Sequence, residues 1–245
     1  MLIRKTVSPR DCARKMNKLL TTMFAFAVAC VTVSAQAQQV TGNAQEGAKK
    51  VAMCVGCHGI IGYQASFPEI HKVPMIAGQS ASYITSALTA YKGGDRKHPT
   101  MRAIADTLKE QDIADLAAYY SQLGLKEGDA PPAALAKPMP ENVQALVSRD
   151  KDNSCTKCHG ANFSTPNDGT VPKLAGQHAD YLFVALKSYR VKNNLHLGRS
   201  NAVMAQQVEP KKFTNAELKT LASYISSLPG DLKTVPESRI HRAAE

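Results

Sequence analysis

Aromatic residues are scarce in this chain of 245 residues. Tryptophan is absent, and the three aromatic residue types together make up 6% of the sequence. Domains of roughly 90–100 residues with so few aromatic side chains have thin cores when they fold alone. The composition therefore favours small domains whose cores are completed by a bound apolar group.

Long apolar runs are also few, and only the run from Leu19 to Val33 is notable. Basic residues precede it and Ser34-Ala35-Gln36-Ala37 follows it, which is the pattern of a secretory signal peptide with an A-x-A cleavage site. We expect cleavage after Ala37, so that residues 1–37 are lost. An uncleaved membrane anchor is an alternative, although this run is short for a span of about 20 residues. A lipoprotein cysteine at Cys30 fits less well, because an apolar stretch follows it.

No cluster of Lys and Arg accompanies the formal net charge of +10. Six basic residues and one acidic residue lie in 1–37, so the rest of the chain carries +5. A nucleic-acid-binding protein would show a basic patch or stripe. We therefore expect no nucleic-acid partner.

After signal removal, no cysteine is left for a structural disulfide. The four remaining cysteines lie in Cys54-Val55-Gly56-Cys57-His58 and Cys155-Thr156-Lys157-Cys158-His159. Both spell C-x-x-C-H, the attachment pattern of haem c. Two thiols one helical turn apart can each bond a vinyl group, and the following histidine can then bind the iron. We expect two covalent haem c groups, with Cys54, Cys57, Cys155 and Cys158 as attachment points and with His58 and His159 on the irons.

Three other uses of these cysteines fit less well. A zinc site does not require a histidine directly after each pair. A thioredoxin-like pair needs a βαβ context that is absent here. A disulfide that closes a two-residue loop stabilises little and needs no histidine.

The chain contains two copies of one unit. The segment from Val73 to Tyr83 returns from Val171 to Tyr181 with Pro-x-x-Ala-Gly-Gln in both copies. Periodic apolar residues predict helices and no strand alternation is found. The expected helices are 44–53, 81–92, 109–123, 141–149, 179–192 and 214–228, the last opening with a capping box. The predicted organisation is a signal peptide 1–37, domains 38–125 and 141–230, a proline-rich linker 126–140 and a tail 231–245.

A methionine recurs at the same place in each copy. Arg96 and Met101 match Arg199 and Met204 in spacing, in what we take to be a polar loop. Met101 and Met204 are therefore the expected sixth ligands, which raise the potential relative to a second imidazole. The rival methionines and histidines have no counterpart in the other copy; they are Met53, Met75, Met139, His71, His98, His178 and His196. His98 is the strongest of these rivals because it neighbours Met101.

Two further pairs are candidates for supporting roles. The carbonyls of Pro74 and Pro172 could accept a hydrogen bond from the iron-bound imidazoles. Arg96 and Arg199 could pair with haem propionates, since guanidinium suits carboxylates. Solvated arginines are the alternative.

Together these motifs resemble the dihaem cytochrome c4 family over nearly all of residues 40–230. The resemblance implies an all-α chain with two tandem class I cytochrome c domains and a periplasmic location, often with loose membrane association. It also implies one-electron transfer between respiratory partners, from a membrane-bound donor such as a bc1-type complex toward a terminal oxidase. The segment from Tyr63 to Lys72 has no match in the second copy, and we expect it to reshape the edge of the first haem.

The expected function is an electron carrier without a small-molecule substrate. One alternative is the cytochrome subunit of a larger oxidoreductase, such as a flavocytochrome sulfide dehydrogenase. Another is a dihaem enzyme, such as a peroxidase or a thiosulfate-type dehydrogenase. A dihaem enzyme would leave one iron open or give it a different ligand, whereas both copies here have a methionine candidate.

Overall fold

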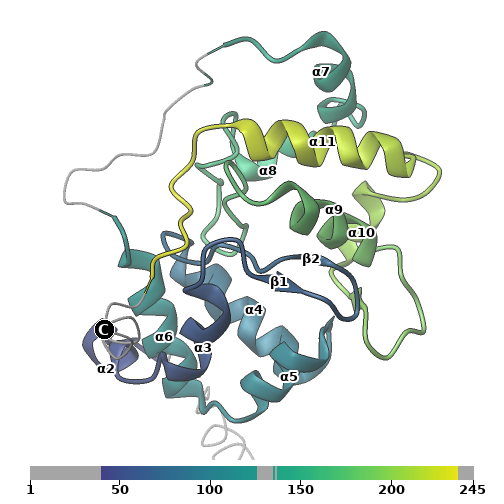
Figure 1. Ribbon diagram of the computed structural model, residues 1–245. Coiled ribbons are helices and arrows are strands. Elements are labelled where there is room, and N and C mark those ends of the chain that lie inside the picture. Colours follow the sequence, from purple (N-terminus) through teal and green to yellow (C-terminus); the bar gives the residue numbers. More distant parts are fainter. Residues whose placement is uncertain (1–39, 126–134, 136, 237–245) are drawn as a thin grey trace, which may run out of the picture. The chain divides into compact units, whose positions relative to one another are not determined.

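The computed structural model describes residues 40–125, 135 and 137–236. The predicted signal peptide, most of the predicted linker and the end of the tail lie outside the described residues. The described chain is mainly helical, as predicted, and its two halves repeat the same order of helices, with an additional β1–β2 hairpin in the first half (Figure 1).

The N-terminal half runs from α2 to α6. Its elements are α2 (Ala44–Ala48), α3 (Ala52–His58), β1 (Gln64–Ala65), β2 (His71–Lys72), α4 (Ala81–Gly93), β3 (Arg96–Lys97), α5 (Pro99–Asp106) and α6 (Glu110–Gln122). The single helix predicted over 44–53 is instead two helices. Gly47 explains part of this difference, because a Cβ there would lie 2.2 Å from the Asp115 carbonyl oxygen. The chain approaches α6 closely at that point and turns before α3 begins.

The C-terminal half runs from α7 to α11. Its elements are α7 (Glu141–Val147), α8 (Cys155–His159), α9 (Ala179–Ser188), β4 (Gly198–Arg199), α10 (Ala202–Gln207) and α11 (Asn215–Ser227). Thr214 and Glu217 form the predicted capping box at the start of α11. Helix α9 ends before Lys192, earlier than predicted, and Asn193 follows with a φ of 56° that no α-helix contains.

Four short strands were not predicted. β1 pairs with β2, and β3 pairs with β4, both antiparallel. Each strand has two residues, which is too short for an alternating pattern to show in the sequence. The β3–β4 ladder joins the two halves, with Arg96 opposite Arg199.

Each half has its own apolar core. In the N-terminal half, α4 and α6 enclose a buried set of Val51, Val55, Ile84, Leu108, Ile113, Leu116, Ala117 and Tyr120. In the C-terminal half, α11 packs on α9 (Figure 1) around Val143, Leu146, Val147, Phe163, Leu182, Val208, Phe213, Leu218, Leu221 and Ile225. Both cores lie beside the helices that carry the cysteine–histidine motifs.

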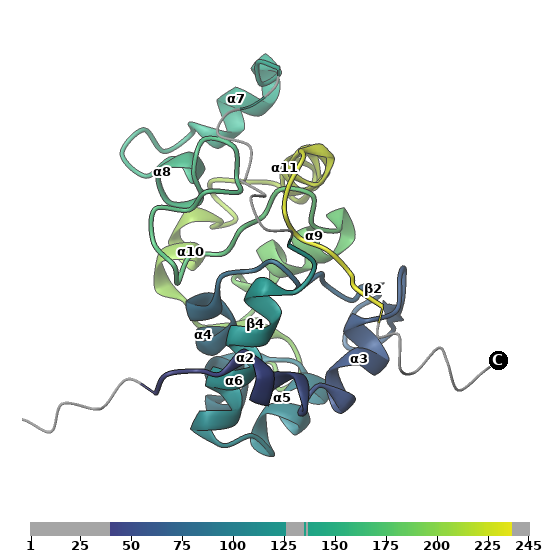
Figure 2. The same cartoon turned by 90° about the vertical axis from the view of Figure 1, so that its left-hand side faces the viewer.

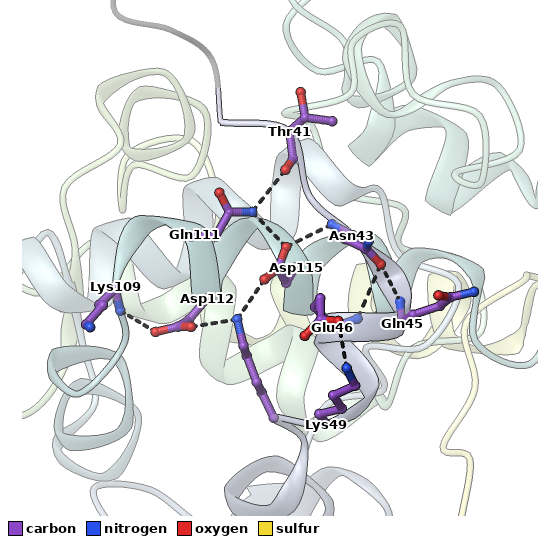
Figure 3. Close-up of polar contacts among 10 residues, drawn as sticks. Thr41, Asn43, Gln45, Glu46, Lys49, Lys109, Gln111, Asp112 and Asp115 are labelled. Carbon is purple, nitrogen blue, oxygen red and sulfur yellow. Dashed lines mark hydrogen bonds and ion pairs between the residues drawn. The ribbon is translucent and has the colours of Figure 1, made fainter.

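Helix α2 is held on α6 by polar contacts around a buried carboxylate (Figures 2 and 3). Asp115 is 2% exposed and accepts hydrogen bonds from the Asn43 amide (2.8 Å), Gln111 (2.8 Å) and the Lys50 ammonium (2.7 Å). Asn43 in turn caps α2. These contacts fix the segment that leads directly into α3.

The 63–72 segment and the tail each cross to the opposite half. The β1–β2 hairpin reaches α9, where Lys72 N–H donates to Asp180 (2.9 Å) and Glu69 pairs with Lys187 (2.6 Å). In the other direction, Lys233 N–H donates to the Ala77 carbonyl at 3.1 Å. We expected the 63–72 segment to reshape the edge of the first haem; the structure shows that it also links the two halves.

Candidate haem sites

Each cysteine–histidine motif lies on a short helix. Cys54, Cys57 and His58 form the last turns of α3, and α8 consists of the second motif alone. The helical turn places the two thiols of a motif on one side, with the histidine at the helix end. None of the four cysteines forms a disulfide within the described residues.

The two histidines have the same orientation. His58 Nδ1 lies 2.8 Å from the Pro74 carbonyl oxygen, and His159 Nδ1 lies 3.0 Å from that of Pro172. A carbonyl can only accept, so Nδ1 carries the proton and the lone pair of Nε2 is free for a metal. Burial lowers the pKa of both histidines, which favours the neutral, metal-binding form.

Met101 and Met204 lie on helices, and the predicted polar loop is wrong. Met101 lies in the first turn of α5 and Met204 in the first turn of α10. The helices are short and capped from the preceding segment, which is why the sequence looked loop-like. The His98 ring accepts from the Met101 amide at 3.4 Å, and Asn201 accepts from the Met204 amide at 2.9 Å. His98 therefore has a structural counterpart, Asn201, that sequence matching did not reveal.

All of these residues line one cavity of about 1120 Å³. That volume exceeds the range of roughly 300–1,000 Å³ for one drug-sized ligand. Both cysteine pairs, both motif histidines, Met101 and Met204 contribute to the lining. The rivals Met53, Met75, His71 and His98 also line it, so the cavity alone does not choose the sixth ligand.

Two arginines, the buried Arg96 and the partly buried Arg199, lie at this cavity without carboxylate partners among the described residues. Arg96 is 9% exposed, and its Nε has no hydrogen-bond partner there. Arg96 donates to Tyr83 (3.2 Å) and Tyr181 (2.6 Å), while Arg199 donates to Tyr181 (3.2 Å). A buried cation without a counter-charge is costly. The pair therefore fits an anionic group such as the propionates of haem.

Tyr181 is the shared residue of this cluster and comes from α9. Burial acts to raise its pKa, but the positive charges of Arg96 and Arg199 outweigh burial and hold the pKa at about 8. The phenol thus lies in a strongly positive environment, and this environment also favours an anionic ligand.

Sequence reasoning did not find the roles of two glutamines. Gln79 and Gln177, in the repeated Ala-Gly-Gln segments, are each 4% exposed. Gln177 bonds the backbone of Met75, and Gln79 bonds the backbone of Lys173, each in the opposite half. Gly78 and Gly176 precede them with φ of 80° and 76°, which turns the chain so that each glutamine faces across. The repetition of Ala-Gly-Gln was the available signal.

Comparison with known proteins agrees with these sites. The family model for cytochrome c matches residues 44–124 and 142–229. The fold and the repeated motif thus define a c-type cytochrome with two tandem domains.

A cytochrome c4 of Stutzerimonas stutzeri is 32% identical over 196 residues, which cover 76% of this chain and 90% of that protein. The structure of reduced recombinant cytochrome c4 from Pseudomonas stutzeri aligns with a TM-score of 0.56 and 30% identity, covering 77% of this chain and 100% of that chain. The chain belongs to the cytochrome c4 family, as its motifs predicted. The predicted fold class and the prediction of an electron carrier rather than an enzyme are thereby confirmed.

A thiosulfate dehydrogenase electron acceptor of Stutzerimonas stutzeri strain A1501 is 30% identical over 171 residues, which cover 66% of this chain and 76% of that protein.

Proposed function

We propose that the protein binds two haem c groups and passes single electrons through them. Cys54 and Cys57 attach one group, and Cys155 and Cys158 attach the other. His58 with Met101, and His159 with Met204, are the proposed iron ligands. The observation that carries this proposal is the repeated arrangement itself, in which both ligand sets border one cavity and both histidines present a free Nε2.

The protein's own groups set the conditions for this transfer. A bound haem c supplies an iron that takes up and releases one electron. Pro74 and Pro172 hold the imidazoles through Nδ1, which fixes their orientation and basicity. Arg96 and Arg199 are positioned to hold the propionates and to compensate their charge. Two methionine ligands would close both sites to substrate, as a carrier requires.

We place this carrier in the periplasm, exported by the signal peptide 1–37. None of the described helices is both long and apolar enough to cross a membrane. Loose membrane association, a donor such as a bc1-type complex and a terminal oxidase as acceptor remain our first proposal for its partners. Contacts between such partners are small and short-lived.

A thiosulfate dehydrogenase is the second candidate donor. It is favoured by the relative named as an electron acceptor of that enzyme. Stopped-flow reduction of the purified protein, by a thiosulfate dehydrogenase with thiosulfate or by a bc1-type complex with quinol, separates the two candidates. The donor that reduces both haems within its own turnover time is the physiological class.

Haem content tests the two sites directly. Mass spectrometry of the exported protein should show two haem additions and a first residue of Gln38. Cys54→Ser with Cys57→Ser should remove one addition, and Cys155→Ser with Cys158→Ser should remove the other. A single haem in the unaltered protein would contradict the proposal.

A further inference from the structure

Each motif histidine is connected through one peptide group to a glutamine of the opposite half. The Pro74 carbonyl that accepts from His58 belongs to the same peptide group as the Met75 N–H. That N–H donates to Gln177 Oε1 at 3.0 Å. In the other half, Pro172 accepts from His159, and the Lys173 N–H of the same peptide donates to Gln79 Oε1 at 3.0 Å.

The orientation of both glutamine amides is determined by their neighbours. Gln177 Nε2 donates to the Met75 carbonyl at 2.9 Å, and Gln79 Nε2 donates to that of Lys173 at 3.0 Å. Each Oε1 also accepts from the backbone amide that follows it, Ser80 or His178, at 3.0 Å. Reversing either amide would place two N–H donors against its NH₂ group. Each glutamine therefore binds both polar groups of one residue in the other half.

Hydrogen bonds in such a chain strengthen one another. An N–H that donates to an amide oxygen polarises its peptide group and makes the carbonyl on the other side a stronger acceptor. A stronger acceptor at Nδ1 makes the imidazole more basic and tunes the metal that it binds. Burial of both glutamines excludes water from replacing these contacts at the surface.

We propose that Gln177 and Gln79 are positioning residues that set the reduction potential of the haem in the opposite half. Gln177 acts on the N-terminal haem through Met75, Pro74 and His58. Gln79 acts on the C-terminal haem through Lys173, Pro172 and His159. The interface between the halves thereby tunes each electron site from across it, and this inference rests on the proposed haem sites.

The proposal is testable because each glutamine should change the reduction potential of the haem in the opposite half only. Gln177→Met keeps the side-chain length but removes both hydrogen bonds to Met75, and should raise the potential of the N-terminal haem. Gln79→Met should raise that of the C-terminal haem. Removal of an outer-shell partner typically costs about 10–100-fold in metal affinity or activity. One bond further out, we expect a change in the redox equilibrium constant of up to about tenfold, or ~59 mV for one electron.

Glu69→Gln is the matched control, because it breaks the ion pair with Lys187 across the same interface and leaves both glutamines in place. Spectroelectrochemical titration gives the reduction potentials of both haems. Met101→His and Met204→His each change the potential of their own haem, which assigns each measured potential to one half. NMR of the His58 and His159 Nδ1 protons gives an independent reading, with an upfield shift expected only in the opposite half.

Three results would overturn the proposal. The first is a shift in the reduction potential of the haem in the same half as the substituted glutamine. The second is an equal shift in the potentials of both haems, as a loosened interface would produce. The third is that neither the potentials nor the Nδ1 proton signals change. Either glutamine variant alone can test the proposal, so the test still stands if one of the two variants does not fold. Haem content and spectra of the unaltered protein test the proposed haem sites separately, before any potential is compared.

Discussion

Replacing Asp115 by alanine should weaken the N-terminal half selectively. The carboxylate lies between α2 and α6 and binds three donors, from Asn43, Gln111 and Lys50 (Figure 3). Burial acts to raise its pKa, but these hydrogen bonds outweigh burial, and the pKa of Asp115 lies below its ordinary value. The contact network therefore depends on the ionised form.

The magnitude follows from what the substitution leaves behind. Leaving a buried hydrogen-bond donor without its acceptor costs about 1–3 kcal/mol. Lys50 keeps a second partner, Asp112 at 2.7 Å, whereas the Asn43 amide loses its acceptor. We therefore expect the upper end of this range, about 3 kcal/mol, because three donors share the lost acceptor, and this corresponds to a change on the order of 100-fold in an opening equilibrium.

Native-state hydrogen exchange of the haem-loaded protein measures this change locally. Amides of α6 in Asp115→Ala should lose protection by that factor. Asp112→Asn is the control, because it removes the other carboxylate charge near Lys50 but leaves the buried contacts of Asp115 intact. Two outcomes would refute the reasoning. In Asp115→Ala, the α6 amides would lose less exchange protection than the α11 amides, or they would lose no more than in Asp112→Asn.

Three further predictions concern the ligands, the acid range and the turns. Met101→Ala and Met204→Ala should each convert only their own haem to a high-spin, ligand-accepting form in optical and magnetic spectra; two intact low-spin signals would remove the assignment. The pKa of Glu217 is lowered to about 2, chiefly by Arg149, so its contribution to stability is complete above pH 4.5 and is lost as the pH falls toward 2. Glu217→Gln should therefore destabilise at pH 6 and converge with the unaltered protein near pH 2 in denaturant titrations. Gly78→Ala should lower the thermal midpoint more than Gly176→Ala, because a Cβ at 78 lies 2.6 Å from the Asp231 carbonyl oxygen while one at 176 has 3.5 Å of clearance; equal midpoints would contradict this.

The sequence predicted the helices and the repeat because both depend on local patterns. The start of α11 was predictable from Thr214 and Glu217, which interact within one turn. The proline carbonyls near the histidines were also predictable, since a Pro-x-x-Ala-Gly-Gln segment follows the histidine in both copies. Met101 and Met204 were found through the repeat although their local structure was misjudged.

The connections between the halves could not be predicted in the same way. Gln79 and Gln177 bind residues more than 90 positions away, and no local pattern reports such a pairing. The pairing of β3 with β4, which places Arg96 opposite Arg199, also cannot be predicted from one sequence, because each strand has only two residues. His98 and Asn201 differ in residue type but cap equivalent helices, so residue identity concealed their common position.

The contacts across the halves are unequal, although the two sites are alike. The 63–72 hairpin extends from the first half to α9, and the tail returns from the second half to Ala77. The hairpin has no counterpart between α8 and α9. The hairpin and the tail add contacts between the halves to those of the glutamines, and we expect them to keep the two sites in a constant relation during electron transfer.

The ligation of both irons is the central claim of this account. Optical and electron paramagnetic resonance spectra of the oxidised, purified protein test it most directly. Two low-spin haems with histidine–methionine ligation, neither of which reacts with peroxide, are the predicted result. A high-spin haem that reacts with peroxide would contradict the claim and would indicate an enzyme with one open iron.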